Sequence, residues 1–331
     1  MNLLIFLSFP IAFVVTYWLT LKWIGVAKKV NIVGKDLNKL GNPLVPEMGG
    51  IPLMGGIVGG TLYYVALNTF LLNQPFYNIY ILGGMTTALI IFIIGLMDDL
   101  LGWKIGLSKL QKPLLTLPAA LPMMVINAGH SVIELPFVGT VDLGTFYPIL
   151  LVPVGIVGAT NAFNMLAGYN GLECGMGVII TATISIVCYV KGSSWVAVLG
   201  GIIVASLVAF LVFNWHPAKI FPGNAFTYLV GAFIAVLVIF GNVEKLALIL
   251  FIPYYLDFLL PLRKKMKVEA YAKVNSDGSL DLPYDGIYDV THLVIKVLKS
   301  IKQKVYERDV VSTLLIFEVV ISLFGIMLYI Q

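Results

Sequence analysis

Two adjacent carboxylates are the first residues in this chain that could carry chemistry. Asp98 and Asp99 come directly after the apolar run 89–97. Ionisable side chains beside lipid are costly and are usually functional. Mg²⁺ commonly binds one or two carboxylates together with phosphate oxygens. The pair therefore predicts a metal or phosphate site at a helix end, and the alternative is a helix terminus that reaches headgroup water.

A polar stretch, TNAFNMLAGYNGLE at 160–173, separates two long apolar runs and contains no Lys or Arg. Its glycines, Gly168 and Gly171, permit positive φ or a close backbone approach. Its uncharged carboxamides belong to Asn161, Asn164 and Asn170. Such a joint between apolar helices indicates a ligand or ion site at a membrane surface, or else a hydrated turn.

A second joint, NWHPAKIFPGN at 214–224, has residue types that suit ligand binding. Phe221 could stack on a ring, Gly223 stands at an expected helix start, and Asn224 could be a cap or a ligand. His216 could act as an acid or base, or it could anchor the chain at the membrane interface. Near the carboxylate pair, Lys104, Lys109 and Lys112 could hold phosphates as point charges, or could be ordinary loop lysines.

The composition places these residues in a membrane protein. Hydrophobic residues make up 59% of the 331 residues and charged residues 11%, and the mean hydropathy is +0.96. Soluble domains carry about 25% charge. Apolar segments of the length that crosses a bilayer recur along the whole chain. The two cysteines, Cys174 and Cys188, are too far apart on one helix to pair with each other.

We expect an all-α polytopic fold, one integral membrane domain over 1–331. All but Lys191 and Lys245 of the 21 Lys and Arg residues fall on one side of the expected topology. The positive-inside rule then places the polar joints in the cytoplasm and both termini outside. The ten expected spans are 3–26, 49–70, 78–97, 112–128, 145–160, 172–190, 195–214, 224–241, 245–262 and 310–330.

Two shorter regions lie outside the expected spans. The external segment 131–144 alternates apolar and polar residues around a turn, which predicts a short hairpin. The cytoplasmic segment 263–308 resembles a soluble region, with a turn between strands at 274–283 and a basic amphipathic helix on the membrane at 291–307.

Taken together, these motifs resemble those of the polyprenyl-phosphate N-acetylhexosamine-1-phosphate transferases. The resemblance is greatest to the eukaryotic and archaeal enzymes that use UDP-N-acetylglucosamine and dolichyl phosphate. It covers residues 20–262, in order. The matching motifs are Lys35-Asp-Leu-Asn-Lys39, Met97-Asp-Asp99, the stretch 161–173, Phe213-Asn-Trp-His-Pro217 and Phe221-Pro-Gly223.

The resemblance implies a role for each matching residue. Asp98 and Asp99 would lie beside Mg²⁺ (or Mn²⁺) and the lipid phosphate, and Asn164 would bind the metal. Lys112, or else Lys109, would contact the diphosphate. The remaining substrate contacts implied, around the uracil, ribose and phosphates, are Lys35, Leu37, Glu47, Gly168, Asn170, Glu173 and Phe221.

This chain departs from the family pattern in two places. Asn224 stands where the family usually has a metal-binding aspartate, so the expected site carries one negative charge less. The Arg/His-rich diphosphate motif of the last cytoplasmic loop is also missing, and only Arg263, Lys264, Lys265, Lys267 and Glu269 are offered near it.

The resemblance implies transfer of N-acetylglucosamine 1-phosphate from UDP-N-acetylglucosamine to dolichyl or another polyprenyl phosphate, the first membrane step of a glycan assembly pathway such as N-glycosylation. The alternatives are another UDP-N-acetylhexosamine donor, or a transporter of an anionic substrate, suggested by the broken joint at 161–172. A membrane prenyltransferase is a further alternative, but it would normally need a second aspartate cluster, and Asp98 and Asp99 stand alone. No nucleic-acid partner is expected, and a homodimer is left open.

Overall fold

A bundle of long helices forms the protein in this computed structural model, which describes residues 2–73, 75–108, 110–135 and 139–330. Among these residues, eight helical segments are long and apolar enough to cross a membrane, and a bent pair makes a ninth. The all-α polytopic membrane class is therefore confirmed. The long helices are α1 (Ser8–Lys29), α2 (Gly50–Ala66), α3 (Asn78–Ile105), α6 (Val152–Met165), α7 (Leu172–Val190), α8 (Ser194–Asn214), α9 (Gly223–Gly241) and α13 (Glu307–Ile330).

The bent pair consists of α10 (Glu244–Leu250) and α11 (Ile252–Leu262), which meet at 54°. A larger difference concerns the expected span 112–128, which is not one long helix. It is divided into α4 (Gln111–Thr116), a 3₁₀ turn (Pro118–Ala120) and α5 (Leu121–Val125). Prolines lack the N–H that continues a helix, and two of them, Pro118 and Pro122, stand where these pieces begin.

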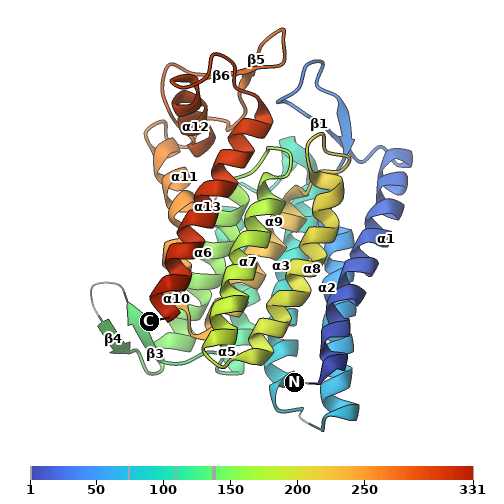
Figure 1. Cartoon of the computed structure of the whole chain (residues 1–331), viewed down its shortest axis with the longest axis vertical. Coiled ribbons are helices and arrows are strands. Elements are labelled where there is room, and N and C mark those ends of the chain that lie inside the picture. Colours follow the sequence, from blue (N-terminus) through green and yellow to red (C-terminus); the bar gives the residue numbers. More distant parts are fainter. Residues whose placement is uncertain (1, 74, 109, 136–138, 331) are drawn as a thin grey trace.

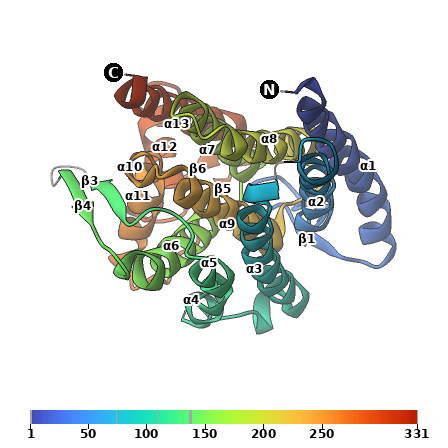
Figure 2. The ribbon, with the colours of Figure 1, turned by 90° about the horizontal axis from the view of Figure 1, so that it is seen from below.

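The helix α9 forms the centre of the bundle. Every residue from Ala225 to Gly241 is buried inside the protein, and α3, α6, α2 and α7 all pack against α9. Figure 2, a view along the bundle, shows α9 enclosed by the other helices. A helix that is apolar on every side is buried in a protein core or in a membrane, and here the neighbouring helices bury it. The residues at the start of α9 are consequently held from several directions.

Both termini lie at one end of the bundle (Figure 1), together with the expected hairpin, β3 (Val132–Leu135) paired with β4 (Gly139–Asp142). The opposite end carries two further hairpins and α12 (Val290–Lys299). One hairpin joins β1 (Val33–Lys35) to β2 (Leu44–Pro46), and the other joins β5 (Lys273–Val274) to β6 (Leu280–Asp281). The expected turn at 274–283 is therefore confirmed.

The expected helix at 291–307 is too long by about two turns. Asp289 Oδ1 accepts a hydrogen bond from the Thr291 nitrogen and caps the start of α12, but the helix ends at Lys299. The chain then runs along β6, where the Leu280 nitrogen donates to the Val305 carbonyl oxygen at 2.7 Å. Residues 300–306 therefore lie outside the helix, and Glu307 already begins α13.

Candidate active site

The carboxylate pair lies on the last turns of α3, at the end of the bundle that carries β1 and β2. Asp98 is 4% exposed. Its Oδ1 accepts a hydrogen bond from the Leu107 nitrogen at 2.7 Å, and its Oδ2 lies 2.8 Å from Lys112 Nζ. The chain turns back after Gly102, which brings Leu107 and Lys112 to the carboxylate. The structure thus joins Asp98 to Lys112, while Lys109 and the side chain of Lys104 lie outside the described residues.

Asp99 binds the start of α9 with both carboxylate oxygens. Oδ1 accepts from the Asn224 nitrogen at 2.7 Å and Oδ2 from the Ala225 nitrogen at 2.9 Å. Gly223 has a φ of +75°, and a Cβ there would lie 2.7 Å from Asp99 Oδ2, so a side chain would displace the carboxylate. Because Asp99 supplies the cap, the interpretation of Asn224 as the capping residue is wrong. Its half-buried side chain lies in the first turn of α9.

Asn164, on the last turn of α6, faces the same turn of α9. Its Oδ1 accepts a hydrogen bond from Thr227 Oγ1 at 2.6 Å, and that hydroxyl also lies 3.2 Å from the Asn224 carbonyl oxygen. Asn161 instead donates to Thr116 and Val157, away from this turn. Thr227 was missed in the sequence, although it stands three residues after Asn224 on one helix face. Asp99 of α3 and Asn164 of α6 therefore both bind the start of α9, which carries Asn224.

Glu47 approaches this group from the first loop. Its pKa is raised above the usual range, first by burial and then by the negative charge of Asp99. The Phe221 nitrogen donates to the Pro46 carbonyl oxygen at 2.7 Å, and the Gly49 nitrogen donates to the Phe221 carbonyl oxygen. Two backbone hydrogen bonds thus fix Phe221 beside Glu47, and the ribose and uracil contacts of these residues stay predictions.

A second polar centre forms around Asn170, which is 3% exposed. Its Nδ2 donates to Asp36 Oδ2 at 3.0 Å, and its Oδ1 accepts from the Ala218 nitrogen at 2.6 Å. Its backbone nitrogen donates to Glu307 Oε1 at 2.7 Å. The side chain holds three chain segments together, and its contact with uracil stays a prediction. Sequence reasoning gave Glu307 no role at this site.

Segment 263–308 lies against the turn that contains Gly168. Gly168 has a φ of +98°, and a Cβ there would lie 3.0 Å from Tyr271 Cε1. Glu173 Oε1 accepts from the Gly168 nitrogen at 2.8 Å. Asn38 bridges the two segments, since its Nδ2 donates to the Gly168 carbonyl oxygen and its Oδ1 accepts from the Ala272 nitrogen.

The Tyr271 side chain is largely buried in this arrangement. Burial, and then the nearby carboxylate of Glu173, raise the pKa of Tyr271 to about 12, with smaller contributions from Glu269 and Glu47. The phenol therefore remains neutral at physiological pH. Tyr271 places an apolar ring with a hydrogen-bonding tip over the Gly168 turn, and it is a candidate site residue that sequence reasoning missed.

Other expected substrate contacts lie farther from the carboxylate pair. Lys35 is exposed on β1, and Leu37 is half-buried between Asp36 and Asn38. Arg263 is exposed, donates to the Ile287 carbonyl oxygen and stacks on Tyr288 at 5.5 Å. Glu269 is exposed, and its backbone nitrogen donates to Tyr284 Oη. No described contact joins Lys35, Arg263 or Glu269 directly to Asp98 or Asp99.

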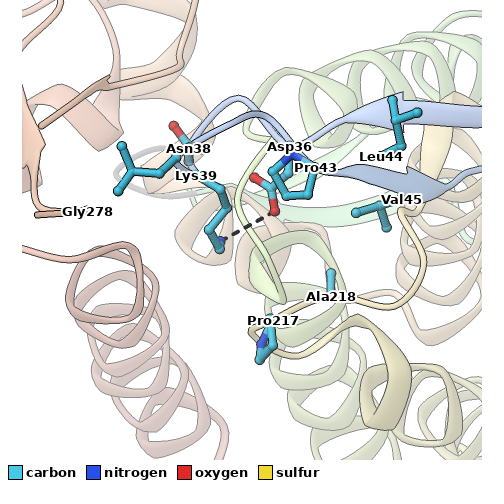
Figure 3. Close-up of a pocket in the computed structure, with 10 residues that line it drawn as sticks. Asp36, Asn38, Lys39, Pro43, Leu44, Val45, Pro217, Ala218 and Gly278 are labelled. Atoms are coloured by element: carbon cyan, nitrogen blue, oxygen red, sulfur yellow. Dashed lines mark ion pairs between the residues drawn. The ribbon is translucent and has the colours of Figure 1, made fainter. Parts of the chain in front are cut away.

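A cavity of about 540 Å³ opens at this end of the bundle. The first loop, the Pro217–Ala218 segment and Gly278 form its walls, and the Asp36–Lys39 ion pair lies inside it (Figure 3). Asp98, Asp99 and Lys112 do not line it. Since Asp36 and Ala218 both bind Asn170, the cavity adjoins the Asn170 centre and is separate from the carboxylate pair.

Comparison with known proteins gives a consistent family. Residues 81–242 match the profile of glycosyl transferase family 4. A Saccharolobus solfataricus protein, provisionally named UDP-N-acetylglucosamine–dolichyl-phosphate N-acetylglucosaminephosphotransferase, is 36% identical over 88% of this chain and 87% of its own length. The protein of that name from Dictyostelium discoideum is 30% identical over 77% of this chain and 70% of its own length. The phospho-N-acetylmuramoyl-pentapeptide-transferase of Aliarcobacter butzleri is 30% identical over 73% of this chain and 74% of its own length.

Proposed function

Because the chain belongs to glycosyl transferase family 4, we propose that it transfers N-acetylglucosamine 1-phosphate from UDP-N-acetylglucosamine to dolichyl or another polyprenyl phosphate. The products are the lipid-diphosphate-sugar and UMP. The observation that carries this proposal is the convergence of Asp98, Asp99 and Lys112 with Asn164 and the first turn of α9 at one end of a membrane bundle. The relatives' names support a sugar-phosphate transferase that acts on a polyprenyl phosphate.

The acceptor requires little activation by the protein. A phosphate monoester has a second pKa near 6, so it is largely dianionic at neutral pH. Catalysis of phosphoryl transfer then depends mainly on positioning and on neutralisation of charge. Lys112 suits this task because Asp98 and the ring of Tyr228, 5.8 Å away, fix its ammonium group.

The oxygen ligands that the protein offers would suit Mg²⁺ or Mn²⁺. Oxygens of the substrate would then complete the coordination of the cation. Among the described residues no group of three His, Cys, Asp or Glu side chains could hold a metal alone. Asp99 binds the first turn of α9, which carries Asn224, and Asn164 binds Thr227 of the same helix. The buried Asp98 Oδ2 has no hydrogen-bond donor other than its ion-pair partner Lys112. Mg²⁺ prefers such partial oxygen sites with added phosphate ligands. Asp98, Asp99, Asn164 and Asn224 would hold the divalent cation. The bound cation would neutralise the negative charge of the donor diphosphate.

The donor nucleotide would bind between the carboxylate pair and the Gly168 turn. Phe221 and Glu47 lie on one side, and Tyr271 covers Gly168 on the other. The distribution of lysines and arginines supports a site that faces the cytoplasm, with both termini outside. In a prokaryote this membrane would be the cell membrane. The reaction would be the first membrane step in assembly of a glycan.

Detergent-solubilised protein, dolichyl phosphate and sugar-labelled UDP-N-acetylglucosamine provide the test. We expect labelled lipid that mild acid releases as the sugar, because a sugar linked to a diphosphate is acid-labile. Equal amounts of UDP-N-acetylgalactosamine, tested in parallel, decide between the two N-acetylhexosamines. No lipid product from either donor would contradict the proposal.

A further inference from the structure

We infer that Glu307, the first residue of the last span α13, is a positioning residue for the donor-binding turn 168–171. This inference depends on the proposed function, and it adds a part of the chain that the family profile, 81–242, does not include. It makes the last span part of the active site as well as a membrane helix.

The side chain of Glu307 is nine-tenths buried and its two oxygens serve different segments. Glu307 is 3% exposed. Its Oε1 accepts from the Asn170 backbone nitrogen at 2.7 Å and from Asn170 Nδ2 at 3.0 Å. Its Oε2 pairs with Lys39 of the first loop and lies 3.6 Å from His216 Nε2. One carboxylate therefore joins the first loop, the asparagine turn and the 214–224 joint.

The charges around Glu307 leave Lys39 as its main partner. The Lys39 ammonium group also pairs with Asp36, whose Oδ2 lies 3.4 Å from Lys39 Nζ. Burial, Lys39 and Arg308 lower the pKa of His216 below its usual value, so at neutral pH this imidazole contributes little positive charge. A buried carboxylate is costly unless it is paired and hydrogen-bonded. The described contacts that compensate the charge of Glu307 come mainly from Asn170 and Lys39, so loss of this charge would change the surroundings of both residues.

The contact with Asn170 fixes a peptide group and not only a side chain. The Asn170 nitrogen belongs to the peptide between Tyr169 and Asn170, in the turn between two glycines of positive φ, Gly168 and Gly171. A charged acceptor on that nitrogen selects one orientation of the peptide. Without it the turn keeps the Gly168 bonds to Glu173 and Asn38, so the fold survives while the Asn170 orientation loosens. The expected result is weaker donor binding.

Steady-state kinetics of Glu307→Gln test this inference. The substitution keeps the shape and one acceptor oxygen but removes the charge. Hydrogen bonds to charged groups contribute more than neutral ones, so we expect KM for UDP-N-acetylglucosamine to rise about tenfold, with kcat and KM for the polyprenyl phosphate within twofold of wild type. Asp309→Asn is the matched control. Asp309 is a carboxylate of the same turn, and it binds Lys302 and the Tyr306 nitrogen, not Asn170.

A double-mutant cycle shows whether Glu307 acts through Asn170. In an Asn170→Ala background, Glu307→Gln should add less than a further twofold to the donor KM, because coupled residues are not additive. The inference would be overturned if the two substitutions were fully additive in the double mutant, or if Glu307→Gln left the donor KM unchanged. It would also be overturned if Glu307→Gln lowered kcat and raised both KM values by the same factor. If Glu307→Gln does not fold, Glu307→Asp keeps the charge but shortens the side chain that reaches the Asn170 nitrogen, and it must raise the donor KM while kcat stays within twofold. Failure of the proposed function is distinct, because the wild type itself would then form no lipid product.

Discussion

Asp99 accepts a hydrogen bond from the Asn224 nitrogen at 2.7 Å, which joins the end of α3 to the start of α9. A negative charge at a helix N-terminus is favourable because the free N–H groups and the helix dipole both point toward it. The same turn of α9 carries Thr227, which binds Asn164. The three helix ends that hold the expected metal ligands therefore form one connected unit.

The carboxylate pair should be required for turnover. We expect Asp98→Asn and Asp99→Asn each to lower kcat by at least about tenfold, roughly 1.4 kcal/mol of barrier. Asp98→Asn removes the charge beside Lys112, and Asp99→Asn removes the charge at the start of α9. Rates with UDP-N-acetylglucosamine and dolichyl phosphate, alongside thermal unfolding of each variant, provide the measurement. Asp142→Asn in the distant hairpin is the control, and normal turnover in both site variants would exclude a catalytic role.

Asn224→Asp should strengthen binding of the metal. If Asn224 is a ligand, a carboxylate in its place adds charge, and a hard cation binds more tightly to more charged ligands. The Mg²⁺ concentration for half-maximal activity should then fall several-fold. Gln111→Glu adds the same charge on exposed α4 and should leave that midpoint in place. An unchanged midpoint in Asn224→Asp would remove this residue from the metal site.

Gly168→Ala should destabilise the protein and weaken donor binding. Its φ of +98° disfavours a side chain by about 1–2 kcal/mol, and the new Cβ would meet Tyr271 at 3.0 Å. We expect a lower midpoint of thermal unfolding and a higher KM for the UDP-sugar. Gly158→Ala is the comparison, because a Cβ on that part of α6 would meet nothing within 4 Å. Equal behaviour of the two variants would argue against a constrained Gly168 turn.

Cysteine labelling should establish the orientation in the membrane. Leu40 is exposed at the active-site end and Thr140 is exposed on β4 at the other. A membrane-impermeant thiol reagent should label Leu40→Cys only after permeabilisation and Thr140→Cys before it. Background should be low, since Cys174 and Cys188 are both buried. Labelling of position 40 from outside would reverse the topology and place the nucleotide site on the wrong face.

The sequence predicted those parts of the candidate site that lie within short continuous segments of the chain. Asp98, Asp99, Asn164 and Gly168 stand in short polar joints between apolar runs, and those joints meet at one end of the bundle. Glu307 lies 137 residues from Asn170 in the chain, so no spacing rule could connect them. Tyr271 is likewise brought to Gly168 only by the packing of segment 263–308. The end of α12 at Lys299 was missed, and the segment after it bonds to Leu280, a residue distant in the sequence.

The fate of the donor's β-phosphate tests the proposed reaction most directly. UDP-N-acetylglucosamine labelled with ³²P in that phosphate would be incubated with the purified protein and dolichyl phosphate, and lipid and nucleotide would then be separated. Transfer of sugar 1-phosphate predicts that the label enters the lipid fraction and that unlabelled UMP is released in equal amount. Release of labelled UDP with an unlabelled glycolipid, or no lipid product at all, would contradict the proposed transfer.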